Sequence, residues 1–134
     1  MTDRATDIPI TEPTDDEIAQ IAELIRGAQR IVVLTGAGIS TESGIPDYRG
    51  PKGIWAKGKP PAIGDFMENE ATRRTYWQRR LESYPDLLAA QPNPAHRALV
   101  EMEQSGKLSA IVTQNIDGLH QRAGSSDDLV IELH

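Results

Sequence analysis

The chain of 134 residues contains no cysteine, and it has no hydrophobic run long enough to cross a bilayer. The absence of cysteine excludes disulfide bonds, thiolate nucleophiles and any cysteine-ligated zinc site built from these residues. The first residues are polar and acidic, without the apolar core of a signal peptide. We therefore predict a cytoplasmic location and no membrane partner.

Positive charge is also scarce. There are 14 lysines and arginines against 20 acidic residues, which gives a formal net charge of −6. This balance argues against a general affinity for nucleic acid or anionic membranes. The arginines at 73–74 and 79–80 form one basic cluster, which we interpret as a solvated helix face. A hydrophobic content of 38% with 25% charged residues is typical of one globular domain.

The spacing of the apolar residues predicts an α/β domain with a parallel sheet. Thr14 and Glu17 form a capping box ahead of an apolar stripe at helical spacing, and Gly27 ends this helix. The apolar run at 31–34 predicts a strand that is buried on both faces. Helices and strands alternate, which favours parallel strands joined by crossovers. The predicted strands are 30–35, 108–113 and 129–133, and the predicted helices are 14–27, 70–83, 86–90, 93–106 and 117–124, with a further helix start at 65–68.

Two glycines, Gly36 and Gly38, directly follow the first predicted strand. A strand, a tight glycine turn and a helix start together present backbone N–H groups to a phosphate, and glycine lets the ligand approach closely. The stretch departs from the usual dinucleotide fingerprint because Thr41 occupies the third small-residue position. No Lys-Ser or Lys-Thr pair follows, so it is not a phosphate loop of the nucleotide-hydrolase kind. A tight turn without a ligand is the alternative.

Residues 44–64 are rich in proline and glycine, so we predict a long loop without regular structure. A loop of this length inside a compact domain is usually functional, and we interpret it as a lid over a ligand. Trp55 is the expected hydrophobic anchor of this lid. Residues 1–13 contain two prolines and no periodicity, and they are predicted to form a mobile tail.

The ends of the three predicted strands carry candidate site residues. Ligands of open parallel sheets bind beyond the carboxyl ends of the strands. Residues 36–38, residues 114–117 and His134 should therefore face one crevice, beneath the lid that carries residues 47–49.

The residue types at these strand ends suggest separate tasks. The backbone of the glycine turn suits a pyrophosphate, and Arg49 suits a phosphate or a carboxylate. Gln114 and Asn115 are neutral groups suited to ribose hydroxyls or a carboxamide. Asp117 either contributes to the site or simply caps the helix that follows it. His134 can act as a general base near neutral pH.

Two other features receive structural interpretations. The aromatic residues Tyr76, Trp77 and Tyr84 recur at helical spacing, which more often indicates packing than a substrate channel. Asn93 and the proline after it predict a helix start, with His96 in the first turn. A histidine there is more often a surface or capping residue than a ligand, so we assign it no chemistry.

Five motifs occur in order along the chain. They are Gly-Ala-Gly-Ile-Ser at 36–40, Gly-Ile-Pro-Asp-Tyr-Arg at 44–49, Pro-Asn-Pro-Ala-His at 92–96, Thr-Gln-Asn-Ile-Asp-Gly-Leu-His at 113–120 and Glu-Leu-His at 132–134. Together they resemble the sirtuin family, the NAD-dependent protein-lysine deacylases, from about residue 30 to the last residue. Residues 41–49 and the pair at 76–77 are most similar to the class II branch of that family.

The resemblance implies a Rossmann-like NAD-binding domain, of which this chain holds the first half, over residues 14–134. The implied cofactor-binding residues are Gly36, Ala37, Gly38, Ser40, Pro46, Asp47, Tyr48, Arg49, Gln114, Asn115, Ile116 and Asp117. Of these, Ala37, Gly38 and Ser40 would line the pyrophosphate and the nicotinamide ribose. The pocket for the nicotinamide carboxamide would be formed by Asp47 together with residues 115–117.

The remaining residues have implied roles near the reacting ribose. Tyr48 matches a family aromatic residue, usually phenylalanine, that shields the reactive ribose carbon. Arg49 would contact a cofactor phosphate or ribose, and Gln114 the ribose hydroxyls. His134 would be the catalytic residue, the general base that activates a ribose hydroxyl.

The resemblance also implies an activity, the NAD-dependent deacylation of an acyl-lysine protein or peptide with release of nicotinamide. A sirtuin continues beyond this histidine with a zinc module that carries four cysteines, and with further strands. Since neither is present, we expect an N-terminal fragment, with zinc bound only in a longer product. The alternatives are a non-catalytic NAD- or ADP-ribose-binding fragment, a protein ADP-ribosyltransferase, and a truncated product that folds poorly.

Overall fold

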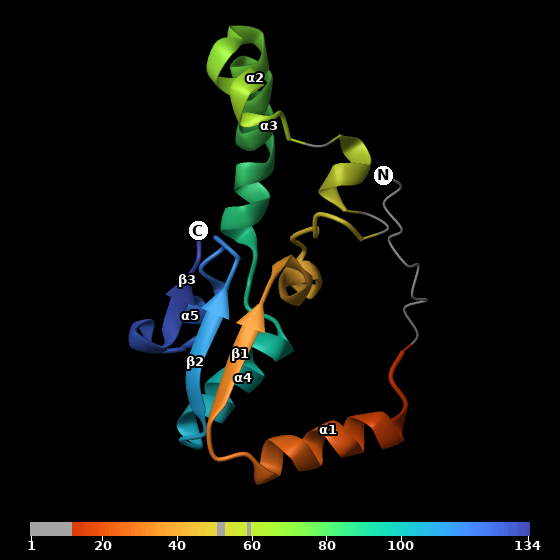
Figure 1. Cartoon of the computed structure of the whole chain (residues 1–134), viewed down its shortest axis with the longest axis vertical. Helices are drawn as coiled ribbons and strands as arrows, with labels where there is room; N and C mark the ends of the chain where they lie inside the picture. Colours follow the sequence, from red (N-terminus) through yellow and green to blue (C-terminus); the bar gives the residue numbers. More distant parts are fainter. Residues whose placement is uncertain (1–11, 51–52, 59) are drawn as a thin grey trace.

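The computed structural model describes residues 12–50, 53–58 and 60–134, and its centre is a sheet of three parallel strands. These are β1 (Ile31–Thr35), β2 (Leu108–Thr113) and β3 (Val130–Glu132), in the spatial order β1-β2-β3 (Figure 1). The α/β class and the parallel sheet are therefore confirmed. Thr35 pairs with Thr113, and Thr113 pairs with Glu132, so all three strands end at the same edge of the sheet.

One face of the sheet carries the core. Helix α4 (Pro94–Gln104) packs against β2 and against the short helix α5 (Leu119–Ala123). The core consists of Leu99 from α4 with Leu108 and Ile111 from β2, and Leu119 of α5 is fully buried. Asn93 caps α4 and a proline fills its first position, as the sequence predicts.

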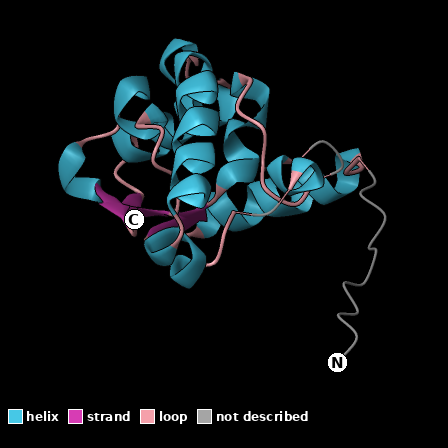
Figure 2. Ribbon diagram, turned by 90° about the horizontal axis from the view of Figure 1, so that it is seen from above, coloured by secondary structure: helices cyan, strands magenta, loops and turns pink. Residues whose placement is uncertain are grey.

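The other face of the sheet is exposed in β1, so the prediction of a strand buried on both faces is wrong for these residues. Val32 and Leu34 are 65% and 68% exposed, because alternate side chains of a strand point to opposite faces and no described helix packs on theirs. Helix α1 (Asp15–Gly27) has the predicted capping box between Thr14 and Glu17. It extends sideways from the sheet in both views and buries none of its apolar residues (Figures 1 and 2).

The segment between β1 and β2 is more regular than predicted. The 3-10 helices η1 (Ala37–Ser43) and η2 (Ile54–Lys57) precede the helices α2 (Ile63–Glu68) and α3 (Glu70–Ala89). The predicted helices 70–83 and 86–90 are one helix that contains Pro85, and the lid contains η2 and the start of α2. Proline lacks only its own N–H, and the chain on both sides of it keeps its helical hydrogen bonds.

The aromatic residues of this segment are less packed than expected. The rings of Phe66 and Tyr76 meet edge to face at 5.2 Å, and Tyr76 also contacts Trp77. Trp77 and Tyr84 nevertheless remain more than half exposed. The packing interpretation therefore holds for Tyr76 and not for the other two residues.

Two further predictions concern the chain ends. The tail predicted for residues 1–13 lies outside the described residues except for its last two positions. The third strand begins at Val130 instead of residue 129, because Asp127–Leu129 forms the 3-10 turn η3. Among the described residues, no helix is both long enough and apolar enough to span a membrane.

Candidate functional site

The three strand ends meet as predicted. The ladder continues one step beyond β1 and β2, because Gln114 N donates to Thr35 O at 3.1 Å. Leu133 N donates to Thr113 O at 2.9 Å on the other side of β2. The loops that begin at Gly36 and Gln114 therefore start side by side, and His134 lies at the end of the third strand (Figure 1).

A partly buried hydrogen-bond network joins the first two of these loops. Ser40 is fully buried in η1, and its Oγ donates to Asp117 Oδ2 at 2.7 Å. Asn115 Nδ2 donates to Gly36 O at 3.1 Å and to Ser40 Oγ at 3.2 Å. We call Gly36, Ser40, Asn115 and Asp117 the strand-end cluster. Residues about 80 positions apart are thus held within hydrogen-bonding distance of one another.

Asp117 makes one local and one long-range hydrogen bond. Its Oδ1 accepts from the N–H of Leu119, the first residue of α5, at 3.0 Å, while its Oδ2 accepts the bond from Ser40. The two oxygens are therefore held in a defined orientation. The role of Asp117 in the site stays a prediction. Asn115 Oδ1, in contrast, accepts no hydrogen bond from any described residue, so this carbonyl is free to bind a ligand N–H group.

The glycines of the turn fit a closely bound ligand. Gly36 and Gly38 have no positive φ angle, so their backbone conformation does not require glycine. A Cβ at Gly38 would have no atom within 4 Å, and one at Gly36 would meet only Gln114 Nε2, at 3.8 Å. The described residues therefore give no reason for glycine at position 38, whereas a phosphate group pressed against this backbone would give one.

The glycines of the lid have a different explanation. A Cβ at Gly53 would lie 2.7 Å from the carbonyl of Tyr48, so the loop's own backbone occupies that space. Ile54 N and Trp55 N donate to Asp47 O and Tyr48 O, which ties residues 54–55 to residues 47–48. Glycine at position 53 is therefore a requirement of the lid's own turn.

The lid residues do not reach the strand-end cluster. Asp47 accepts a hydrogen bond from Gly50 N at 2.9 Å, and the guanidinium of Arg49 stacks on the Trp55 ring at 4.5 Å. The Tyr48 ring also contacts that of Trp55, with the ring centres 6.0 Å apart. Trp55 thus anchors the lid to its own residues 48–49. The structure brings the glycine turn and residues 114–117 together, but it does not bring residues 47–49 to them. Pro46, the last candidate of the lid, is exposed.

Three other candidate residues are open to solvent. Gln114 is exposed, and Ile116 exposes 57% of its surface next to Asn115. His134 is exposed at the carboxyl end of β3, where the sequence places it. No hydrogen bond or ion pair joins its side chain to the strand-end cluster, so its role as a general base stays a prediction.

Two buried histidines were not identified as part of the site. His96 and His120 are 0% and 2% exposed, and their ring centres are 5.0 Å apart. Burial is the main cause that lowers the pKa of each imidazole, and the neighbouring His96 further lowers the pKa of His120. The surface position considered for His96 is wrong, although its capping role is confirmed, because Asn93 N donates to His96 Nδ1. The position of His120 directly after the buried Leu119 is the only sequence signal that could have indicated its burial.

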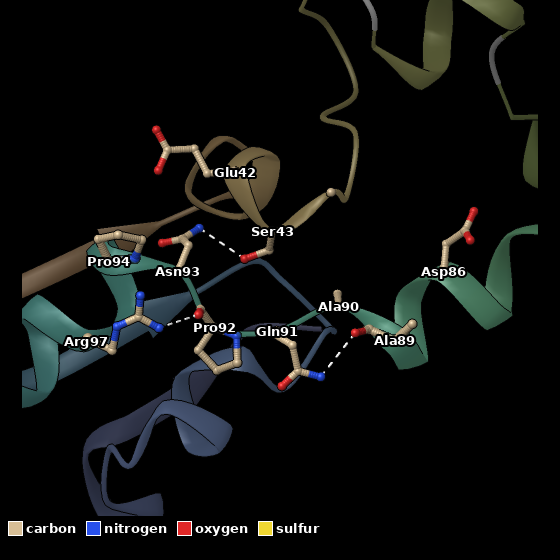
Figure 3. A pocket seen from close by; sticks show the side chains of 11 residues that line it. Glu42, Ser43, Asp86, Ala89, Ala90, Gln91, Pro92, Asn93, Pro94 and Arg97 are labelled. Carbon is tan, nitrogen blue, oxygen red and sulfur yellow. Dashed lines mark hydrogen bonds between the residues drawn. The ribbon is translucent and has the colours of Figure 1, made fainter.

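A groove lined by none of the predicted site residues lies between η1, α3 and α4. It has a volume of about 540 Å³ and is lined by the end of η1, the end of α3 and the start of α4 (Figure 3). Asn93 is one of its lining residues, with Nδ2 donating to Ser43 Oγ at 3.1 Å and to Ile39 O at 2.7 Å. These bonds fasten the start of α4 to η1.

Comparison with known proteins agrees with this arrangement. The family model described as Sir2 family matches residues 36–134, which include the whole strand-end cluster. The chain belongs to the Sir2 family. It is 47% identical to the NAD-dependent protein deacylase 2 of Archaeoglobus fulgidus over 120 residues, which cover 90% of this chain and 46% of that protein. It is 45% identical to the human mitochondrial NAD-dependent protein lipoamidase sirtuin-4 over 131 residues, 95% of this chain and 41% of that protein.

Solved structures of the family share the fold. A structure described under the mechanism and regulation of Sir2 enzymes superposes with a TM-score of 0.79 at 46% identity, over 90% of this chain and 47% of that one. A Sir2 complex with p53 peptide and NAD+ gives a TM-score of 0.70 at 40% identity, over 87% and 45% of the two chains. The Sir2 resemblance and the Rossmann-like fold are therefore confirmed. The chain spans less than half the length of these relatives, and its described residues hold no group of histidine, aspartate or glutamate side chains suited to a metal ion.

Proposed function

We propose that this chain supplies the NAD-binding half of the active site of an NAD-dependent protein-lysine deacylase. The observation that carries the proposal is the strand-end cluster, which joins the glycine turn to residues 114–117 and leaves one amide carbonyl free. Its relatives in the Sir2 family include proteins named as NAD-dependent protein deacetylases and deacylases. A cytoplasmic location, zinc binding in a longer product and membership of class II stay predictions from the sequence.

Each part of the site has a task in this proposal. NAD, when bound, supplies the glycosidic bond that is cleaved as nicotinamide leaves and the ribose that receives the acyl group. The backbone at Gly36 and Gly38 would hold the pyrophosphate, since it is accessible and no side chain obstructs it. Asn115 Oδ1 would accept a hydrogen bond from the nicotinamide carboxamide, and the oriented Asp117 carboxylate would accept another.

The more exposed residues complete the proposal. His134 would remove a proton from a ribose hydroxyl, and its solvent-exposed position would let that proton pass to water. Tyr48 and Arg49 would act only after residues 47–49 move toward the cluster, because they now contact Trp55. Closure of this loop would exclude water from the reacting ribose, which protects it until the acyl-lysine oxygen arrives.

The experiment is a titration of the chain with NAD by isothermal calorimetry, using a matched pair of glycine variants. Gly38→Ala places a methyl group where we propose the pyrophosphate lies, and Gly27→Ala places one at the exposed end of helix α1. Neither methyl group meets an atom of the described residues within 4 Å, so both variants should keep the wild-type fold. We expect Gly38→Ala to weaken NAD binding about tenfold or more and Gly27→Ala to leave it unchanged.

The same samples separate the possible functions. Incubation with NAD and an acetyl-lysine peptide tests for release of nicotinamide together with free lysine. Turnover supports the deacylase, whereas saturable binding without turnover supports the NAD- or ADP-ribose-binding alternative. Transfer of ADP-ribose to the peptide supports the transferase alternative. If NAD does not bind, or if both glycine variants bind it equally well, the proposal is wrong.

A further inference from the structure

Behind the strand-end cluster lies a second polar network, which is almost completely buried. His120 Nε2 lies 2.9 Å from Thr35 Oγ1, and Thr35 Oγ1 lies 2.8 Å from Thr113 Oγ1. Thr113 Oγ1 accepts a hydrogen bond from Asn115 N at 3.1 Å. A continuous chain of contacts therefore runs from α5, through the last residues of β1 and β2, to the backbone of Asn115.

A second chain of contacts reaches the same place from α4. Asn93 N donates to His96 Nδ1 at 3.3 Å, and Asn93 Nδ2 donates to Ile39 O in η1. The two chains stop at facing histidines. Among the described residues, His96 Nε2 and His120 Nδ1 are buried and have no hydrogen-bond partner. A buried nitrogen without a partner is costly, so this gap in an otherwise complete network needs an explanation.

The protonation of the two rings follows from their other contacts. His96 Nδ1 accepts a hydrogen bond, so the proton of a neutral His96 is on Nε2, which makes that nitrogen a donor. Neither of the two unpartnered nitrogens reaches a partner directly within the part of the chain that the structure describes, so a water between the rings is needed to satisfy them. With its proton on Nε2, His120 donates to Thr35 Oγ1 and keeps Nδ1 as an acceptor. One buried water then accepts from His96 Nε2–H and donates to His120 Nδ1.

We propose that His96 and His120 form a linked pair of neutral imidazoles that positions Asn115. His96 Nε2–H donates to one buried water, that water donates to His120 Nδ1, and His120 Nε2–H donates to Thr35 Oγ1. The oriented hydroxyl pair of Thr35 and Thr113 then fixes the amide of Asn115. The pair does not touch the proposed cofactor, so both histidines are positioning residues.

The pair also connects the two halves of the site. On one side, Asn93 links His96 to η1, which carries Ser40. On the other side, His120 is linked to the backbone N–H of Asn115 through the hydroxyl groups of Thr35 and Thr113. A change in either ring should therefore alter the orientation of the Asn115 side chain relative to Ser40 and Gly36. The effect on NAD binding rests on the proposed function, whereas the hydrogen-bonded pair itself does not.

The first test records the 15N chemical shifts of the imidazoles in the full chain at pH 7.5, by long-range ¹H–15N correlation. We expect both buried histidines to be neutral, with Nε2 protonated and Nδ1 unprotonated. A protonated Nδ1 on His120, or a doubly protonated ring, overturns the proposal. This result does not depend on NAD, so it decides the pair even if the proposed function is wrong.

The second test asks whether the pair positions Asn115. His120→Phe keeps the ring volume but removes both nitrogens, and Thr113→Val removes the hydroxyl that binds the Asn115 amide while keeping the side-chain shape. We expect each variant to shift the backbone and side-chain amide resonances of Asn115 and to weaken NAD binding about 3- to 10-fold, the effect of one lost hydrogen bond. We expect the double variant to be no weaker than the single ones, because both changes interrupt one chain of contacts.

A control on the same helix separates positioning from general damage. The Arg122 side chain is exposed and makes no hydrogen bond or ion pair with a described residue, so Arg122→Ala should leave the Asn115 resonances and NAD affinity unchanged. If His120→Phe does not fold, Thr113→Val alone carries the test. Unmoved Asn115 resonances in a folded Thr113→Val chain would overturn the positioning role. If the variants shift the Asn115 resonances but bind NAD as well as the wild-type chain does, the positioning role is also overturned. If the wild-type chain itself does not bind NAD, the proposed function fails and not the histidine pair.

Discussion

Replacing Asn93 with alanine tests how firmly helix α4 is fastened to the site. Asn93 is 5% exposed, and its Oδ1 caps α4 by accepting hydrogen bonds from Ala95 N and His96 N. Its Nδ2 donates to Ile39 O at 2.7 Å and to Ser43 Oγ at 3.1 Å. One side chain thus stabilises a helix start and also holds η1.

The expected cost follows from these two tasks. Loss of an N-cap destabilises a protein by about 1 kcal/mol. The partly buried carbonyl of Ile39 would lose its donor as well, which adds about 1–3 kcal/mol. We therefore expect Asn93→Ala to lower the free energy of unfolding by about 2–4 kcal/mol. This change corresponds to a clear drop in the urea midpoint with an unchanged slope.

A second asparagine of the same chain provides the control. Asn69 caps α3 by accepting a hydrogen bond from Thr72 N at 3.1 Å, and it is exposed. Asn69→Ala removes a cap without breaking any tertiary contact, so we expect it to cost about 1 kcal/mol or less. Urea unfolding followed by far-UV circular dichroism compares the two variants. If Asn93→Ala costs no more than Asn69→Ala, the link between α4 and η1 contributes nothing and our reasoning is refuted.

Three further predictions concern the core, pH and catalysis. Leu119→Ala should cost about 2–5 kcal/mol in urea unfolding, because this side chain is fully buried, whereas Leu81→Ala at a 73% exposed position should cost less than about 0.5 kcal/mol. Burial lowers the pKa of His96 and His120 in the folded chain. The free energy of unfolding should therefore not depend on these two histidines above the unfolded pKa of ~6.5. As the pH decreases below that value, it should decrease by up to about 1.4 kcal/mol per pH unit for each histidine. Equal free energies of unfolding at pH 7.5 and pH 5.5 would contradict this. In a deacylating protein that contains these residues, His134→Ala should lower turnover about 10²- to 10⁴-fold without loss of NAD binding, and near-normal turnover would exclude the general-base role.

The strand ends could be predicted because their signals are local. Each strand is a short apolar run, and parallel strands must bring their carboxyl ends to one edge. This rule alone placed Gly36 beside Asn115, and the structure confirms it through the bond from Asn115 Nδ2 to Gly36 O. The hydrogen bond from Leu119 N, at the start of α5, to Asp117 Oδ1 also depends on local sequence, since the two residues are two positions apart.

The parts that could not be predicted depend on contacts between distant residues. The burial of His96 and His120 results from the packing of α4 against α5, and the only local signal for it is the apolar Leu119 directly before His120. The single helix α3 was missed because proline usually breaks a helix, and only the hydrogen bonds on both sides of it show that this one continues. The exposed face of β1 was missed because an apolar run does not reveal which face is covered.

The long insertion between the first two strands has a consequence for how this chain folds. Strands β2 and β3 are joined by residues 114–129, whereas β1 must find β2 across residues 36–107. Closing the longer loop costs roughly 1.3 kcal/mol more chain entropy, so we expect α4, β2, α5 and β3 to assemble first and β1 to join last. Ser40 meets Asn115 and Asp117 only in that final step. A ligand bound to both sides of the strand-end cluster would therefore slow the detachment of β1. Ligand binding would in this way lower the unfolding rate of the whole chain.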